Sequence, residues 1–379
     1  MEAATMEMPC FGLPLGEADF KRQSRVAYLL DLARKTRNAR MLVELKGDSI
    51  EPDGWVREFH QVFAKVGGQM CWHPSPKLTR KMVDGEGNLT PELQLMAHQA
   101  DHLRREFGLL AVTIHLMPAI AQEPEANAGL ERYNSPIGPE EMLSHLKSQV
   151  KPLKHLNKLT GGILNIETVD ITNFRGGTRL PTYLALQTGA WMDIVWLRDQ
   201  TGVRITADSE HMLCAGNLLM RRRDLKDVPR WLPFTIEVEI QIREGERYVA
   251  EDELYQIAGY WLNLGQAPLV MEKKELELPE HLQLLKPHLY HFGGAVQANL
   301  NGTIGTHLPY DEGNAEQMAI LDLQLEMIKK GQGIGGVVEV VGQLDPAKYD
   351  PWSPRIADDE EAKRHTLEVL LKRWDKISG

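Results

Sequence analysis

Four acidic or imidazole side chains stand at the ends of short apolar runs in this sequence. Glu167 closes "GGILNIE" and Asp208 closes "GVRITAD", while His291 lies in "PHLYHFGG" and Glu339 in "GGVVEVVG". Carboxylate and imidazole are ligands that first-row divalent metals accept. Several carboxylates in one place repel one another and lose hydration unless a cation neutralises them. We therefore predict that residues of this kind at the ends of apolar runs hold at least one divalent metal ion, such as zinc or manganese.

Four more histidines follow apolar runs and are candidates for additional metal ligands. His73 ends "GGQMCWH" and His115 ends "LLAVTIH", while His211 and His307 lie in "DSEH" and "GTHLPYDEGN". A single histidine at a strand end is more often a hydrogen-bonded structural residue than a ligand. Together, however, these histidines exceed what one ion needs, so the sequence leaves open one, two or three ions.

Other polar residues near these runs are candidates for contact with a substrate. Asn165 lies two residues before Glu167, on the same face of the expected strand, and could contact a substrate hydroxyl. Arg175, in "NFRGGTR", either binds an anionic group or is a solvated loop residue. Three charges end another apolar run and could touch a substrate, but we interpret them as surface charges: Glu44, Lys46 and Asp48.

The elements that must position these residues alternate along the whole chain. Apolar runs typical of strands occur at 9–15, 40–47, 67–73, 109–115, 161–167, 202–208, 287–294 and 335–342. Helix-period segments lie between them at 20–35, 53–66, 90–107, 138–156 and 314–330. Alternation of this kind favours a parallel sheet, and eight strands favour closure into a (β/α)8 TIM barrel. In such a barrel the strand ends meet at one mouth, so residues far apart in sequence become neighbours there.

One interval is too long for a single strand and helix. Between the sixth and seventh expected strands, residues 221–285 include an alternating run from Phe234 to Asp252 that is broken at "REG", followed by a helical pattern. We predict a hairpin and helix inserted on the catalytic face of a single domain that spans residues 1–379.

Composition narrows the class of protein. The chain has 379 residues, 42% hydrophobic and 25% charged, with a formal net charge of −10. That charge argues against nucleic acid as a partner, because non-specific binding depends on clustered Lys and Arg. The acidic N-terminus and the absence of a long apolar run predict a cytoplasmic protein without a membrane partner. The three cysteines, Cys10, Cys71 and Cys214, form neither a disulfide framework nor a thiolate zinc pattern.

The motifs "ILNIET", "ITADSEH", "YHFGG...GTHLPYDEGN" and "GVVEVVG" resemble those of the xylose isomerase-like TIM-barrel superfamily, over most of the chain. That superfamily includes sugar isomerases and epimerases, endonuclease IV and the ultraviolet-damage endonucleases. In its epimerase-like branch, the resemblance implies one divalent ion on Glu167, Asp208, His291 and Glu339. It further implies that the two glutamates act as base and acid beside a carbonyl, and that His211 contacts the sugar.

The endonuclease IV branch implies three zinc ions instead. His73 and His115 would join Glu167 at the first ion, and the third ion would be held by His211 and His307. The aspartate that the family places two residues before its last histidine is Gly305 here.

Three hypotheses follow for function. The first is a metal-dependent isomerase or epimerase of a sugar or related polyhydroxy molecule, with a homo-oligomer left open. The second is multi-zinc phosphoester hydrolysis. The third is a barrel that binds without catalysis.

Overall fold

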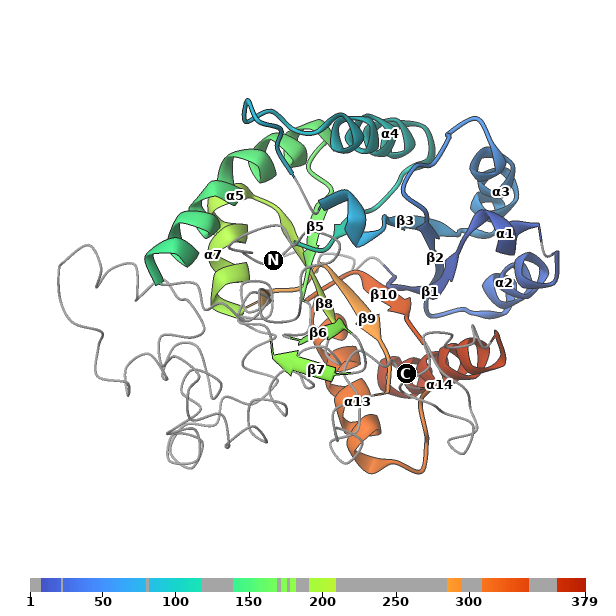
Figure 1. Cartoon of the computed structure of the whole chain (residues 1–379). Coiled ribbons are helices and arrows are strands. Elements are labelled where there is room, and N and C mark those ends of the chain that lie inside the picture. The colour runs from blue at the N-terminus through green and yellow to red at the C-terminus, as the bar shows by residue number, and fades with distance from the viewer. Residues whose placement is uncertain are drawn as a thin grey trace, which may run out of the picture.

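Eight parallel strands form a closed barrel in a computed structural model of the chain (Figure 1). The structure describes residues 8–21, 23–79, 82–116, 139–168, 172–175, 178–181, 191–208, 285–294, 309–340 and 360–379. The strands are β1 (Cys10–Leu15), β2 (Arg40–Lys46), β3 (Gln69–His73), β4 (Val112–Ile114), β5 (Leu164–Glu167), β8 (Arg204–Asp208), β9 (Leu289–Phe292) and β10 (Gly335–Val338). Each pairs in parallel with its neighbours, and β1 pairs with β10 to close the barrel. All eight predicted strands and the predicted fold class are confirmed.

Helices surround the barrel on the outside (Figure 1). The longer ones are α2 (Gln23–Lys35), α3 (Trp55–Phe63), α4 (Pro91–Phe107), α5 (Pro139–Leu159), α7 (Trp191–Thr201), α13 (Ala315–Lys329) and α14 (Glu360–Ser378). Short helical turns occur at α1 (Glu17–Phe20), η1 (Ala64–Val66) and η2 (Pro76–Thr79). Five of the longer helices match the predicted segments, whereas α7 and α14 were not predicted. A small antiparallel pair, β6 (Thr172–Arg175) with β7 (Thr178–Pro181), was not predicted either.

Helix α4 illustrates how local sequence sets the limits of an element. It begins after Thr90 with proline at its first position, where the missing N–H has no partner to lose. It ends at Gly108, whose φ of 67° lies in the left-handed region that glycine adopts without strain. Between these points Leu93, Met96 and Leu103 are buried and face the barrel.

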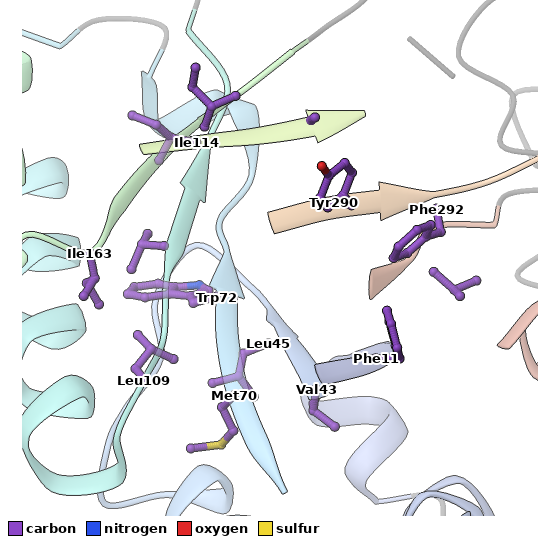
Figure 2. Packing of buried hydrophobic residues seen from close by; sticks show 14 of the residues in the cluster. Phe11, Val43, Leu45, Met70, Trp72, Leu109, Ile114, Ile163, Tyr290 and Phe292 are labelled. Carbon is purple, nitrogen blue, oxygen red and sulfur yellow. The ribbon is translucent and has the colours of Figure 1, made fainter. Parts of the chain in front are cut away.

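The main core lies between the outer face of the barrel and the helices. In β2 and β3 this face carries Val43, Leu45, Met70 and Trp72, all with at most 1% of their surface exposed (Figure 2). Because successive strand residues point to opposite faces, the residues between these point into the barrel. The side chains of a strand are therefore divided between a helix-facing set and an inward-facing set.

The inward-facing side chains are stacked in layers along the barrel axis. A small apolar cluster, separate from the main core, is formed by Cys10, Leu42, Cys71, Ala111, Leu289 and Val337. Above it lies a polar layer in which Thr113 and Thr206 share a hydrogen bond of 2.9 Å between their hydroxyls. Strand β2 crosses all layers with Arg40, Leu42, Glu44 and Lys46, one residue per layer. Both ends of the barrel thus receive polar side chains from the same strands.

The predicted insertion cannot be placed in this fold. Residues 209–284 lie outside the described residues, so the 221–285 segment, its hairpin and its position on the catalytic face stay predictions. Among the described residues, no helix combines the length and apolar composition that a membrane crossing requires.

Candidate metal centre

The four predicted metal ligands meet at the carboxyl ends of their strands. Glu167, Asp208, His291 and Glu339 each offer a ligand atom, and these atoms lie within 4.8 Å of one another. Three of them are almost completely buried, and the Glu339 side chain is 16% exposed. The barrel therefore concentrates three carboxylates and an imidazole in a site with little access to water.

His291 is oriented as a metal-binding imidazole would be. Its Nε2 lies 3.1 Å from Glu44 Oε1, and since a carboxylate only accepts hydrogen bonds, Nε2 carries the proton. Its Nδ1 faces Glu167 Oε1 at 3.2 Å and Glu339 Oε2 at 3.4 Å, and no described residue donates a hydrogen bond to it. A lone pair directed at two carboxylates is unfavourable unless a cation or a second proton lies between them. The residues present therefore fit a divalent ion, and Glu44 is the outer partner that fixes the ring.

The neighbouring charges shift the pKa values of His291 and Glu167 in opposite directions. Burial lowers the pKa of His291, but the charges of Glu167, Glu339 and Glu44 together raise it well above its usual value. Burial raises the pKa of Glu167, whereas the neighbouring His115, His291 and His73 lower it well below its usual value. Glu167 thus remains ionised, and its charge favours a cation beside it, either a second proton on His291 or a metal ion.

Glu44 and Lys46 are not the surface charges that the sequence suggested. Glu44 is fully buried, and the Lys46 side chain is only 33% exposed. The surface interpretation was wrong because it assumed that the end of β2 is exposed to solvent. Glu44 and Lys46 instead lie on the face of β2 that points into the barrel. The signal was present in the sequence, since Glu44 lies two residues beyond Leu42 on the same face. Asp48 is exposed, as predicted, and accepts a hydrogen bond from the Ser75 amide at 3.0 Å.

Lys46 supplies a cation of the protein's own beside the predicted metal ligands. Its Nζ lies 2.6 Å from Glu44 Oε2, 2.5 Å from Glu339 Oε1 and 2.8 Å from His73 Nδ1. These three residues, with His291, form another group whose spacing could hold a metal ion. The lysine ammonium already neutralises that group, so it does not require an ion.

His73, His115 and Glu167 form the remaining group with metal-ligand spacing. His115 Nε2 lies 2.8 Å and His73 Nε2 lies 3.4 Å from Glu167 Oε2, while Glu167 Oε1 faces His291. Because an ammonium only donates, the contact with Lys46 makes His73 Nδ1 an acceptor and places the ring proton on Nε2. Burial and the charge of Lys46 lower the pKa of His73, but Glu167, Glu44 and Glu339 together raise it above its usual value. With Lys46 in this position, His73 Nε2 has no lone pair for a metal.

The predicted substrate-binding residues and the two remaining histidines lie outside the cluster of candidate metal ligands or outside the described residues. Asn165 lies inside the barrel one layer below Glu167, fully buried, and its amide donates to Thr206 Oγ1 at 3.0 Å. Arg175 ends β6 opposite Thr178 in the unpredicted hairpin, and its side chain is not described. Substrate contact for either stays a prediction. His211 and His307 lie outside the described residues, so their predicted roles stay predictions as well.

Comparison with known proteins gives the fold and no more. No family model matches the chain, and no curated protein matches it. Among solved structures, D-psicose 3-epimerase from Clostridium cellulolyticum H10 is 11% identical with a TM-score of 0.50, covering 97% of this chain and 98% of its own. The chain shares the barrel fold of that epimerase.

Two further solved structures match with lower TM-scores. Endonuclease IV from Thermus thermophilus is 11% identical with a TM-score of 0.44, covering 97% of this chain and 100% of its own. A xylose isomerase-like TIM barrel protein from Mycobacterium smegmatis, solved with magnesium, is 13% identical with a TM-score of 0.44, covering 97% and 98%. At such identities a match is evidence of architecture, and the chemistry must be argued from the site.

Proposed function

We propose that this protein is a divalent-metal-dependent isomerase or epimerase of a sugar or related polyhydroxy carbonyl compound. The observation that carries the proposal is the orientation of His291, whose proton is held by Glu44 while its Nδ1 faces Glu167 and Glu339. One ion held by Glu167, Asp208, His291 and Glu339 would act as a Lewis acid that polarises the substrate carbonyl.

The two glutamates are equipped to move a proton. Each has one oxygen directed at His291 Nδ1 and the other held by a neighbouring base or cation. Glu167 Oε2 contacts His115 at 2.8 Å, and Glu339 Oε1 contacts Lys46 at 2.5 Å. Both carboxyls have lowered pKa values, so both are ionised and able to accept a proton from a carbon beside a carbonyl. In the proposal one glutamate removes the proton from carbon and later releases it to solvent, while the other takes a proton from solvent and delivers it to the second carbon or to the opposite face.

Lys46 and His115 act as positioning residues in this scheme. Each holds one oxygen of a glutamate and so fixes the rotation of that carboxylate beside His291 Nδ1. The surrounding residues exclude water, since Glu167, Asp208 and His291 have at most 1% of their surface exposed. Exclusion of water strengthens the electrostatic effects on which proton abstraction from carbon depends.

The test is exchange of substrate hydrogen with solvent. Protein loaded with manganese or zinc is incubated in D2O with a panel of ketopentoses, ketohexoses and their phosphates, and deuterium on carbon is measured by mass spectrometry. We expect Glu167→Gln to abolish incorporation, and Glu58→Gln, the same change on an exposed residue of α3, to leave it intact. Undiminished exchange in a folded Glu167→Gln protein removes the proposed role.

A second function, phosphoester hydrolysis at a centre of several ions, is favoured by the His73, His115 and Glu167 group. Glu167 could bridge two ions because its two oxygens face different groups. The contact between Lys46 and His73 favours the single-ion alternative. Elemental analysis of protein purified without chelator distinguishes the two, since one metal per chain supports the isomerase and two or three support the hydrolase. Loss of one equivalent in His73→Ala and in His115→Ala would further support the hydrolase.

A further inference from the structure

A cavity lies at the end of the barrel opposite the candidate metal centre. Its volume is about 330 Å³, within the lower range of small-molecule sites. The first residues of several strands line it, because the strands begin at this end. Its polar lining consists of Arg40, Gln69, Arg204 and His288. Apolar side chains, including Ile328, Ile334 and Trp374, cover another part of the wall.

The cavity carries positive charge that its own walls do not neutralise. None of the described residues that line it is acidic. In the described part of the chain no carboxylate pairs with Arg40 or Arg204, and the printed partner of Arg204 Nη1 is His288 Nε2 at 2.9 Å. Burial lowers the pKa of Arg204, as expected for a guanidinium without an anionic neighbour. Two partly buried cations in one cavity are unfavourable unless an anion joins them.

His288 does not add a third cation at neutral pH. Burial and the charge of Arg204 lower its pKa to about 4. The neutral ring accepts the Arg204 hydrogen bond and so holds that guanidinium in place. The other four N–H donors of Arg204 include a pair that could bind two oxygens of one oxyanion.

The barrel fixes the two guanidiniums rather than leaving them on mobile loops. Arg40 opens β2 in register with Cys10 of β1, and Arg204 is in register with Asn165 of β5. Both have the inward parity, and Leu42 and Thr206 follow them in the layers above. A site with this support loses little conformational entropy when it binds a ligand.

We infer that this cavity binds a small organic anion. Its oxyanion head, a carboxylate or a phosphate, bonds to the guanidiniums of Arg40 and Arg204. Its apolar body packs against Ile328, Ile334 and Trp374. The apolar layer of Cys10, Leu42 and Cys71 separates this site from the metal centre. Binding here therefore needs no metal, and the inference is independent of the proposed function.

The experiment is a calorimetric titration of the whole chain with benzoate, with neutral benzamide of the same shape, and with inorganic phosphate. We expect saturable binding of benzoate and at least about tenfold weaker binding of benzamide, because a charge-assisted pair is replaced by a neutral contact. Phosphate binding at comparable strength identifies the oxyanion head as the main determinant, and much weaker phosphate binding identifies the apolar wall as required. Both results support an anion site, whereas equal binding of benzoate and benzamide overturns it.

Variants locate the site. Arg204→Gln should weaken benzoate binding by at least about tenfold, and Arg204→Lys, which keeps the charge but loses the paired donors, by less. Arg105→Gln, on an exposed face of α4, is the matched control and should bind like the wild type. Circular dichroism and the thermal unfolding temperature of Arg204→Gln report whether the barrel is folded. Should a folded Arg204→Gln protein bind benzoate as the wild type does, or should no titration reach saturation, the inference is wrong.

Discussion

Replacing Glu44 by glutamine tests whether this buried carboxylate prepares His291 for a metal. The amide oxygen of the new glutamine can still accept the proton of His291 Nε2, now at 3.1 Å from Glu44 Oε1, but without the negative charge. A hydrogen bond to a charged group contributes about 1.5–3 kcal/mol and a neutral one about 1 kcal/mol. The loss is therefore about 0.5–2 kcal/mol, or roughly 2–30-fold in metal affinity. Outer carboxylates of histidine ligands typically contribute roughly 10–100-fold, which overlaps this range.

The assay is competition for zinc against a chromophoric chelator, with Glu58→Gln as the exposed control. Glu44→Gln also weakens the pairing of Lys46, whose Nζ lies 2.6 Å from Glu44 Oε2, so its free energy of unfolding without metal should fall. We expect a loss of about 1–3 kcal/mol, less than for a fully buried pair, because Lys46 is one-third exposed and retains Glu339. Thermal unfolding checks that the variant is folded. Zinc affinity within about twofold of the wild type would refute the assigned role of Glu44.

Three further predictions concern other parts of the barrel. Lys46→Met removes the donor to His73 Nδ1, so the ring proton can move to Nδ1 and leave a lone pair on Nε2. The zinc content measured by elemental analysis should then rise from one to two per chain. An unchanged zinc content contradicts the assigned ring tautomer. Gly12→Ala should destabilise the fold by about 3 kcal/mol or more in chemical denaturation, because a Cβ there would lie 1.4 Å from the Leu42 carbonyl oxygen; the exposed Gly85→Ala is the control. His288 has a folded pKa of about 4 against 6.5 unfolded, so the unfolded state binds more protons between these values. Wild-type stability should therefore fall relative to His288→Asn by up to roughly 3 kcal/mol as pH falls from 6.5 to 4, and a constant difference would contradict the lowered pKa.

The sequence predicted those features that depend on periodicity. Apolar runs separated by helix-period segments predicted all eight strands. The polar residues near the ends of most of these runs, including Glu167 and Asp208, indicated the mouth of the barrel. Helix α7 was missed because its sequence lacks the helical alternation of apolar and polar residues. Apolar residues such as Trp191, Ile194 and Trp196 are not spaced to form a single apolar stripe. The β6 and β7 pair was missed because its four-residue strands carry few apolar residues.

The part of the centre that could not be predicted depends on side-chain contacts between distant strands. Glu44 reaches His291 across 247 positions of sequence, and Lys46 reaches Glu339 across 293. No local pattern distinguishes a carboxylate that supports a histidine from one that meets solvent. Only barrel closure, which places β2 beside β1 and opposite the ligand strands, decides between them.

Because residues of β2 alternate between the inside of the barrel and the helices, the core and both ends of the barrel depend on the length of this strand. Arg40, Leu42, Glu44 and Lys46 point inward, and Met41, Val43 and Leu45 face the helices. Deletion of one residue within the strand would exchange the two sets beyond the break, sending charged groups under the helices and apolar groups into the mouth. The candidate metal centre, the core and the proposed anion cavity would be disrupted together. Natural variants of this chain should therefore change length in the loops on either side of β2 and keep its seven residues uninterrupted.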